Sequence, residues 1–140
     1  MIILDTNVVS EPLKPEPSQA VLDWLDAQEP QTLFLTTISL AELLAGVEVL
    51  PAGRRRDALA LALSTQVLAL FGSRVLPLDT AAAQAFAKTH ASAQSQGNPI
   101  GFADCAIAAI ARAQGFSVAT RNGRDFKGCG VDLIDPWADQ

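Results

Sequence analysis

Short apolar runs and longer stretches of helical periodicity alternate along the chain. The apolar runs predict strands at residues 2–4, 33–35, 75–78, 116–119 and 131–134. Apolar residues that recur every three or four positions predict helices at residues 18–30, 40–50, 54–71, 80–97 and 102–114. Prolines between residues 12 and 17 predict an open connection after the first strand.

This alternation predicts an α/β fold with a central parallel sheet that helices cover on both faces. The chain shows no internal repeat, linker or low-complexity segment, so we expect one domain over residues 1–140. In open parallel sheets, ligands bind beyond the carboxyl ends of the strands. A functional site is therefore expected at that edge.

The composition predicts a protein that folds around its own hydrophobic core. Of the 140 residues, 49% are hydrophobic, and a domain of this size buries roughly two thirds of its unfolded surface. Cys105 and Cys129 have no second pair or suitably spaced histidine to form a zinc site, so we interpret them as free thiols. The sequence contains neither a signal-peptide pattern nor a membrane-spanning apolar stretch, which predicts a cytoplasmic protein without membrane contact.

Four acidic residues fall where the predicted elements reach the carboxyl edge of the sheet. Asp5 directly follows the first strand, and Asp125 lies in the loop after the strand at 116–119. Glu42 and Asp104 lie in the first turns of helices that begin near the same edge. Carboxylates gathered without a cation repel one another, whereas Mg²⁺ or Mn²⁺ prefers oxygen ligands and removes that repulsion. The pattern therefore predicts a divalent-metal site.

Each acid also has a structural interpretation, which the residues alone leave open. Glu42 completes the capping-box pattern Ser39-Leu40-Ala41-Glu42. Asp104 would be stabilised by the dipole of its helix, and Asp125 would suit a turn. Asp5 is harder to explain structurally, because a carboxylate at the end of a buried strand is costly unless it is paired or bound to metal.

The net charge of -5 argues mildly against a nucleic-acid ligand, because phosphate binding depends mainly on Lys and Arg. The basic residues are clustered, however. We interpret residues 54–56, three arginines, as a solvated helix start, although contact with phosphate stays open. A second cluster borders the proposed site and consists of Arg121, Arg124 and Lys127. Trp137 is interpreted as a packing residue, with base stacking as the alternative.

Several motifs resemble those of one known family. They are MIILDTNV at residues 1–8, ISLAEL at 38–43, IGFAD at 100–104, and ATRN at 119–122 with DF at 125–126. Together they resemble PIN-domain ribonucleases. More narrowly, SEP at 10–12, LPAG at 50–53 and IDPW at 134–137 are similar to VapC and FitB toxins of bacterial toxin-antitoxin pairs. The resemblance extends over essentially the whole chain.

The resemblance implies a PIN-like nuclease fold and a metal-dependent endoribonuclease activity. It implies that Asp5, Glu42 and Asp104 hold Mg²⁺ or Mn²⁺, directly or through water. Some relatives place the fourth acid where this chain has Asn122, and others where it has Asp125. We choose Asp125 as the fourth ligand and interpret Asn122 as a polar residue that supports the site.

The resemblance also implies a substrate and binding partners. An RNA substrate would be hydrolysed by metal-activated water. A VapB-like antitoxin would cover the acidic pocket, and Arg is the cation whose geometry best matches carboxylates. Contact with operator DNA would occur only through the antitoxin, and the toxin would form a homodimer.

Two other function classes remain open. Phosphatases of the aspartyl-phosphate type also place an Asp after the first strand, but they usually need another acid two residues later, where this chain has Asn7. A non-catalytic interaction module would instead use its acids to bind a basic partner. Metal binding distinguishes this module from a nuclease.

Overall fold

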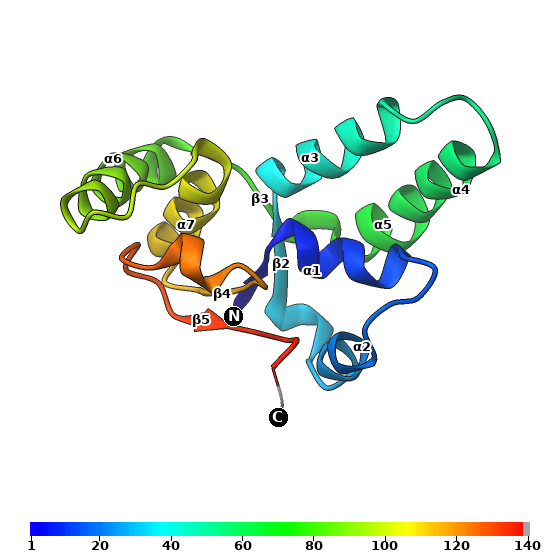
Figure 1. Cartoon of the computed structure of the whole chain (residues 1–140), viewed down its shortest axis with the longest axis horizontal. Coiled ribbons are helices and arrows are strands. Elements are labelled where there is room, and N and C mark those ends of the chain that lie inside the picture. The colour runs from blue at the N-terminus through cyan, green and yellow to red at the C-terminus, as the bar shows by residue number, and fades with distance from the viewer. Residues whose placement is uncertain (139–140) are drawn as a thin grey trace.

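A sheet of five parallel strands forms the centre of the computed structural model, which describes residues 1–138 (Figure 1). The strands are β1 (Ile2–Leu4), β2 (Leu33–Thr36), β3 (Val75–Leu76), β4 (Ser117–Ala119) and β5 (Leu133–Ile134). Their order is β3-β2-β1-β4-β5, and each neighbouring pair is parallel. The predicted α/β fold is therefore confirmed, with β1 at the centre of the sheet.

Helices cover both faces of the sheet. The helices on one face are α1 (Thr6–Ser10), η1 (Glu11–Leu13), α2 (Gln19–Asp26), α3 (Thr37–Glu48), α4 (Arg54–Ala62), η3 (Leu63–Leu68) and α5 (Ala69–Phe71). Those on the other face are α6 (Thr80–Ser95), α7 (Phe102–Gln114) and η5 (Gly123–Phe126). Short 3-10 turns, η2 (Pro30–Thr32) and η4 (Gly72–Arg74), lead into β2 and β3.

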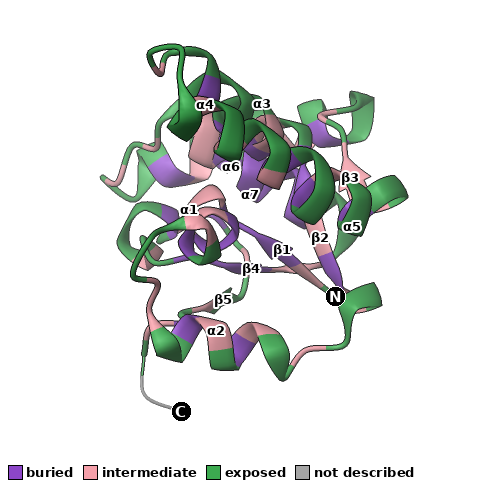
Figure 2. Cartoon of the chain, turned by 90° about the vertical axis from the view of Figure 1, so that its right-hand side faces the viewer, coloured by how far each residue is buried: buried purple, intermediate pink, exposed green. Residues whose placement is uncertain are grey.

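Alternate residues of the central strands belong to two hydrophobic clusters. Ile3 pairs with Val118 in the cluster under α6 and α7, and Leu4 pairs with Ala119 in the cluster under the opposite helices. In Figure 2 the buried positions follow the central strands, whereas α4 and the outer turns of α2 are exposed. Strands buried on both faces must be apolar throughout, which explains the uninterrupted run from Ile2 to Leu4.

Helix α7 lies between the sheet and α6, and its residues from Cys105 to Ala111 are buried. It ends at Gly115, whose φ of 74° is a left-handed conformation that glycine adopts without strain. The predicted helix at 102–114 is confirmed. Cys105 and Cys129 are buried free thiols, as predicted. Because α7 begins at the carboxyl edge of the sheet, its first turn places Asp104 there.

Two helix starts differ from the sequence-based expectations. Residues 6–13 form α1 and η1 rather than an open connection, because the Asp5 side chain caps the backbone N–H of Thr6. Helix α3 begins at Thr37 and not at residue 40. The helix predicted at 54–71 is present, with the π-helical segment η3 between α4 and α5.

Within residues 1–138, no helix is long and apolar enough to cross a membrane.

Candidate metal centre

Asp5 is fixed where the central strand meets α1. Its backbone N–H donates to Ala119 O at 2.9 Å, which extends the pairing of β1 with β4. Its Oδ1 accepts the Thr6 N–H at 2.8 Å, and its Oδ2 accepts the Thr120 hydroxyl at 2.7 Å. Only 4% of the residue is exposed. A carboxylate held on both oxygens has a single orientation toward the sheet edge.

Burial is the largest cause that raises the pKa of the Asp5 carboxyl above its ordinary value of 3.8. The hydrogen bonds from Thr120 and Thr6 favour the ionised form and lower the pKa, while the charges of Glu42 and Asp125 raise it further. The ionised state of Asp5 is thus costly in the absence of a cation.

Glu42 reaches the site from the second turn of α3. The helix is capped by Thr36, whose Oγ1 accepts the Ser39 N–H at 3.1 Å. Ser39 is therefore not the cap, and the predicted capping box that ends at Glu42 is wrong. Thr6 Oγ1 instead lies 2.7 Å from Glu42 Oε1 and 2.9 Å from Ser39 Oγ. Because a hydroxyl has one proton, Thr6 donates to Glu42 and accepts from Ser39.

Asp104 lies in the first turn of α7, as predicted, so the dipole of that helix still favours its charge. Its pKa is nevertheless raised from 3.8 to about 6, first by burial and then by the charges of Asp5, Asp125 and Glu42. The other three predicted acids are thus all close enough to act on this carboxyl. We call Asp5, Glu42, Asp104 and Asp125 the carboxylate cluster.

Asp125 comes to the cluster from η5, the 3-10 turn that follows β4. The residue is exposed, and its backbone N–H donates to Asn122 O at 2.9 Å. Its charge raises the pKa of both Asp5 and Asp104. Asn122 is also exposed, and its N–H donates to Thr120 Oγ1 at 3.0 Å. The predicted supporting role of the Asn122 side chain stays a prediction.

The carboxylate cluster has no cationic partner in the part of the chain that the structure describes. The ion pairs there involve none of its members, and no basic side chain shifts the pKa of Asp5 or Asp104. As the side chains stand, no three Asp, Glu, His or Cys residues between 1 and 138 are grouped tightly enough to hold a metal ion. The four carboxylates therefore lie close enough to affect one another's charge, but as they stand they are too far apart to hold an ion together.

The donor set of the cluster fits a hard divalent cation. All its ligand atoms are carboxylate oxygens, which Mg²⁺ and Mn²⁺ prefer. A divalent ion would also offset the repulsion that raises the Asp104 pKa. Asp5 and Asp104 are anchored at the end of β1 and on α7, whereas Glu42 and Asp125 are exposed and have more room to move. Binding would therefore close the cluster around the two anchored acids.

Thr120 is a buried polar residue of the site to which the sequence analysis gave no role, and the buried Ser39 was interpreted only as a helix cap. Thr120 directly follows β4, and its hydroxyl orients Asp5 because β4 is the neighbour of β1. A hydroxyl residue after a buried strand was the available signal. Its partner was not identifiable without the strand order.

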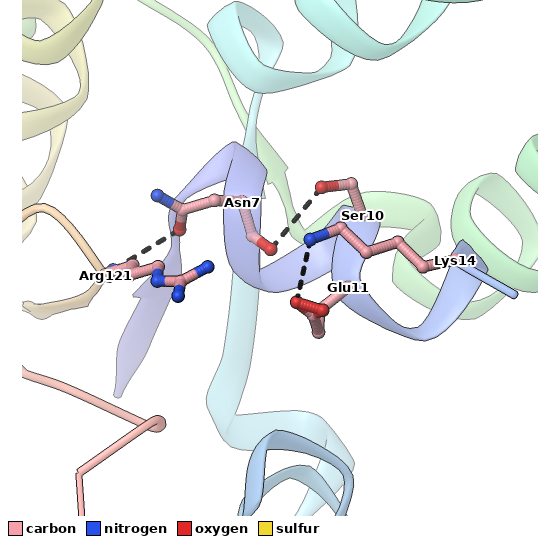
Figure 3. A network of polar contacts seen from close by, with 5 residues as sticks. All are labelled: Asn7, Ser10, Glu11, Lys14 and Arg121. Carbon is pink, nitrogen blue, oxygen red and sulfur yellow. Dashed lines mark hydrogen bonds and ion pairs between the residues drawn. The ribbon is translucent and has the colours of Figure 1, made fainter. Parts of the chain in front are cut away.

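Further polar contacts follow α1 and η1, from Asn7 to Lys14 (Figure 3). Asn7 Oδ1 accepts the Arg121 N–H at 3.4 Å, and Asn7 O accepts the Ser10 hydroxyl at 3.4 Å. Farther along, Lys14 Nζ lies 3.0 Å from Oε1 of Glu11, which is buried. The network ties the segment after β4 to the start of α1.

A groove of about 910 Å³ opens beside Glu42, between α3, α4 and the segment around η1. Its walls are mainly apolar and include Leu13, Leu43, Val47 and Leu59. Glu42 is the member of the carboxylate cluster that lines the groove, and the basic Lys14 and Arg55 line it as well.

Comparisons with known proteins agree with this geometry. The model of the PIN domain family matches residues 2–130. The chain is 48% identical to VapC ribonuclease Y4jK of Sinorhizobium fredii, over 98% of each chain. It is 40% identical to Toxin FitB of Neisseria gonorrhoeae, over 99% of this chain and 100% of that one. A solved structure of FitAB bound to the IR36 DNA fragment matches with a TM-score of 0.96 and 37% identity, covering 100% of this chain and 98% of that one.

Proposed function

The chain belongs to the PIN-domain family and, within it, to the VapC and FitB toxins, and on this premise we propose that it is a divalent-metal-dependent endoribonuclease. It acts as the toxin of a toxin-antitoxin pair and hydrolyses RNA phosphodiester bonds. The observation that carries this proposal is the carboxylate cluster, in which burial and the charges of three other acids, with no balancing cation, raise the pKa of Asp104 to about 6.

Mg²⁺ or Mn²⁺, when bound, activates water for attack on the phosphodiester and balances the charge that develops on the phosphate. Asp5 and Asp104 would hold the ion, and Glu42 and Asp125 would complete its surroundings, directly or through water. Thr120 and Thr6 keep the Asp5 carboxylate in one orientation through their hydrogen bonds. Asp104 must lose its proton before it can act as a ligand.

The alternative functions have less support. A phosphatase of the aspartyl-phosphate type would need a second acid at position 7, where Asn7 instead accepts a hydrogen bond from the Arg121 backbone. A non-catalytic module that binds a basic partner would also use an acidic cluster. It would not need the cluster to bind a divalent ion, so metal binding separates the two proposals.

The proposed partner is a VapB-like antitoxin. The similar FitAB structure contains an antitoxin-toxin complex on DNA, and in this chain the apolar groove beside Glu42 would accept a segment of such a partner. An Arg of the antitoxin would pair with the unpartnered carboxylate cluster and block it. Operator DNA would be reached through the antitoxin. Homodimer formation stays a prediction from the resemblance.

The test of the proposed function incubates the purified protein with total RNA and Mn²⁺ or Mg²⁺. We expect cleavage that disappears with EDTA and in Asp104→Asn. The matched control is Asp26→Asn, which removes an exposed carboxylate from α2 and should cleave normally. Cleavage that survives both EDTA and Asp104→Asn would overturn the proposal.

A second measurement separates the nuclease from the interaction module. Calorimetric titration of the wild-type protein with Mn²⁺ should reveal a binding site, and Asp5→Asn should abolish it. The module is supported instead if the wild type binds no ion, or if Asp5→Asn binds as the wild type does.

A further inference from the structure

Arg121 is a basic residue placed directly beside the carboxylate cluster. It follows Thr120, whose hydroxyl bonds to Asp5, and precedes the turn that carries Asp125. Its backbone N–H donates to Asn7 Oδ1 at 3.4 Å, which ties it to the start of α1 (Figure 3). The Arg121 backbone therefore lies between two corners of the cluster.

The Arg121 guanidinium is nevertheless not used to neutralise the cluster. It forms no ion pair within residues 1–138, although the residue is exposed and the turn that follows it carries Asp125. Its charge is not among the causes that shift the pKa of Asp5 or Asp104. The guanidinium is instead centred 5.2 Å from the ring of Trp137.

The cation–π contact explains this position. A guanidinium over an indole face is attracted to the negative face of the ring. The Trp137 ring packs on the hydrophobic cluster under α1 to α5. The backbone N–H of Trp137 donates to Asp135 Oδ1 at 2.9 Å, which fixes the main chain that carries the ring. The preceding Pro136 is buried. Trp137 thus holds the guanidinium of Arg121 off the carboxylates, although the backbone of Arg121 borders the cluster.

We infer that Arg121, positioned by Trp137, binds a backbone phosphate of single-stranded RNA next to the bond that is cut. The inference rests on the proposed function. The carboxylate cluster repels a polyanion, so a substrate strand needs a cation close to it. A guanidinium suits this role because its planar donors match two phosphate oxygens at once. Trp137 is a positioning residue and Arg121 is the residue that touches RNA.

The test measures how the affinity for a short, fluorescein-labelled single-stranded RNA depends on KCl concentration. Ca²⁺ replaces Mg²⁺ in the buffer, and gels verify that the RNA stays intact. Each phosphate neutralised on a single strand contributes about 0.7 to the slope of log affinity against log salt. We expect Arg121→Gln to reduce the slope by about 0.7. The charge-matched control Lys88→Gln, on the exposed side of α6, should leave the slope unchanged.

Variants of Trp137 separate positioning from a purely structural role. Trp137→Phe keeps an aromatic face and should bind RNA nearly as the wild type does, whereas Trp137→Leu should weaken binding several-fold. In the Arg121→Gln background, Trp137→Leu should have no further effect on RNA affinity, because the side chain that it positions is absent. A merely structural Trp137 would weaken binding equally in both backgrounds.

Failure of this inference and failure of the proposed function give different results. If the wild type binds and cleaves RNA but Arg121→Gln keeps the full salt slope, the phosphate contact is wrong and the nuclease proposal stands. If Arg121→Gln binds RNA normally but no longer binds the antitoxin, the guanidinium serves a protein carboxylate instead. If the wild type neither binds nor cleaves RNA, both proposals fail together.

Discussion

Asp5 and Asp125 are two corners of the same carboxylate cluster, yet the protein builds them in opposite ways. Asp5 ends the central strand, is 4% exposed, and receives a hydrogen bond on each carboxylate oxygen. Asp125 lies on a 3-10 turn and is exposed. The strand corner is fixed before any ion arrives, whereas the turn corner can adjust. If the proposed ion binds, we expect Asp5 to set its position and Asp125 to complete its surroundings.

The turn corner is held from outside the sheet. Asn98, in the connection between α6 and α7, donates its side-chain N–H groups to Lys127 O at 2.8 Å and to Arg124 O at 3.4 Å. Ser92 of α6 donates its hydroxyl to Gly128 O at 3.1 Å. These hydrogen bonds fix the backbone on both sides of Asp125. The corner therefore depends on how the connection between the helices is packed, and not on strand pairing.

The largest effect is expected at the strand corner. Asp5→Asn removes the charge but keeps the shape, and we expect RNA cleavage to fall by about 10³-fold or more, as for other members of a catalytic unit. The measurement is the single-turnover cleavage rate at saturating Mn²⁺. Circular dichroism should show an intact fold. If Asp5→Asn reduces the cleavage rate less than Asp125→Asn does, Asp125 and not Asp5 is the more important of the two acids.

At the turn corner we expect a smaller loss. Asp125→Asn should reduce the single-turnover rate by about 10², and part of this loss should be recovered at high Mn²⁺, because Asp5 and Asp104 still define the site. Asn122→Ala is the matched variant on the same turn, and it should reduce the single-turnover rate much less than Asp125→Asn does. If Asn122→Ala costs more than Asp125→Asn, the fourth corner has been assigned to the wrong residue.

The same contrast explains what the sequence could predict. The order of apolar runs predicted the sheet and its carboxyl edge, so Asp5 and Asp104 could be placed together from their positions in strand and helix. The capping box was wrong because β2 continues to Thr36, which is the actual cap of α3. Thr120 was missed because its bond to Asp5 requires β4 to lie beside β1, and the sequence does not encode strand order locally.

The acidity of Asp104 predicts how pH acts on the site. Its pKa is about 6 without an ion, and a ligand carboxyl must be ionised, so proton and metal compete for it. We expect Mn²⁺ affinity, measured by calorimetry, to fall about tenfold per pH unit below 6. Asp104→Asn should weaken this dependence, and the part that remains would come from Asp5, whose pKa is also raised. An affinity that is constant from neutral pH to below 6 would contradict the prediction.

The stability of the metal-free protein should respond to pH in the opposite direction. The folded pKa of Asp104 lies above its ordinary value of 3.8, so between these values the folded state binds the proton more tightly than the unfolded state. Protonation of Asp104 therefore increases the free energy of unfolding as pH falls through 6. The measurement is the free energy of unfolding from urea titrations at several pH values. As pH falls through 6, this free energy should increase more for the wild type than for Asp104→Asn.

The smallest effect is expected where the connection between helices holds the turn corner. Asn98→Ala removes both bonds that grip the backbone around Asp125, and we expect single-turnover cleavage to fall about fivefold, equivalent to roughly 1 kcal/mol. Ser95→Ala is the control, because that hydroxyl bonds to the backbone of its own helix. In the Asp125→Asn background, Asn98→Ala should have no further effect on the rate. An undiminished effect there would mean that Asn98 supports the fold generally and does not position the turn corner.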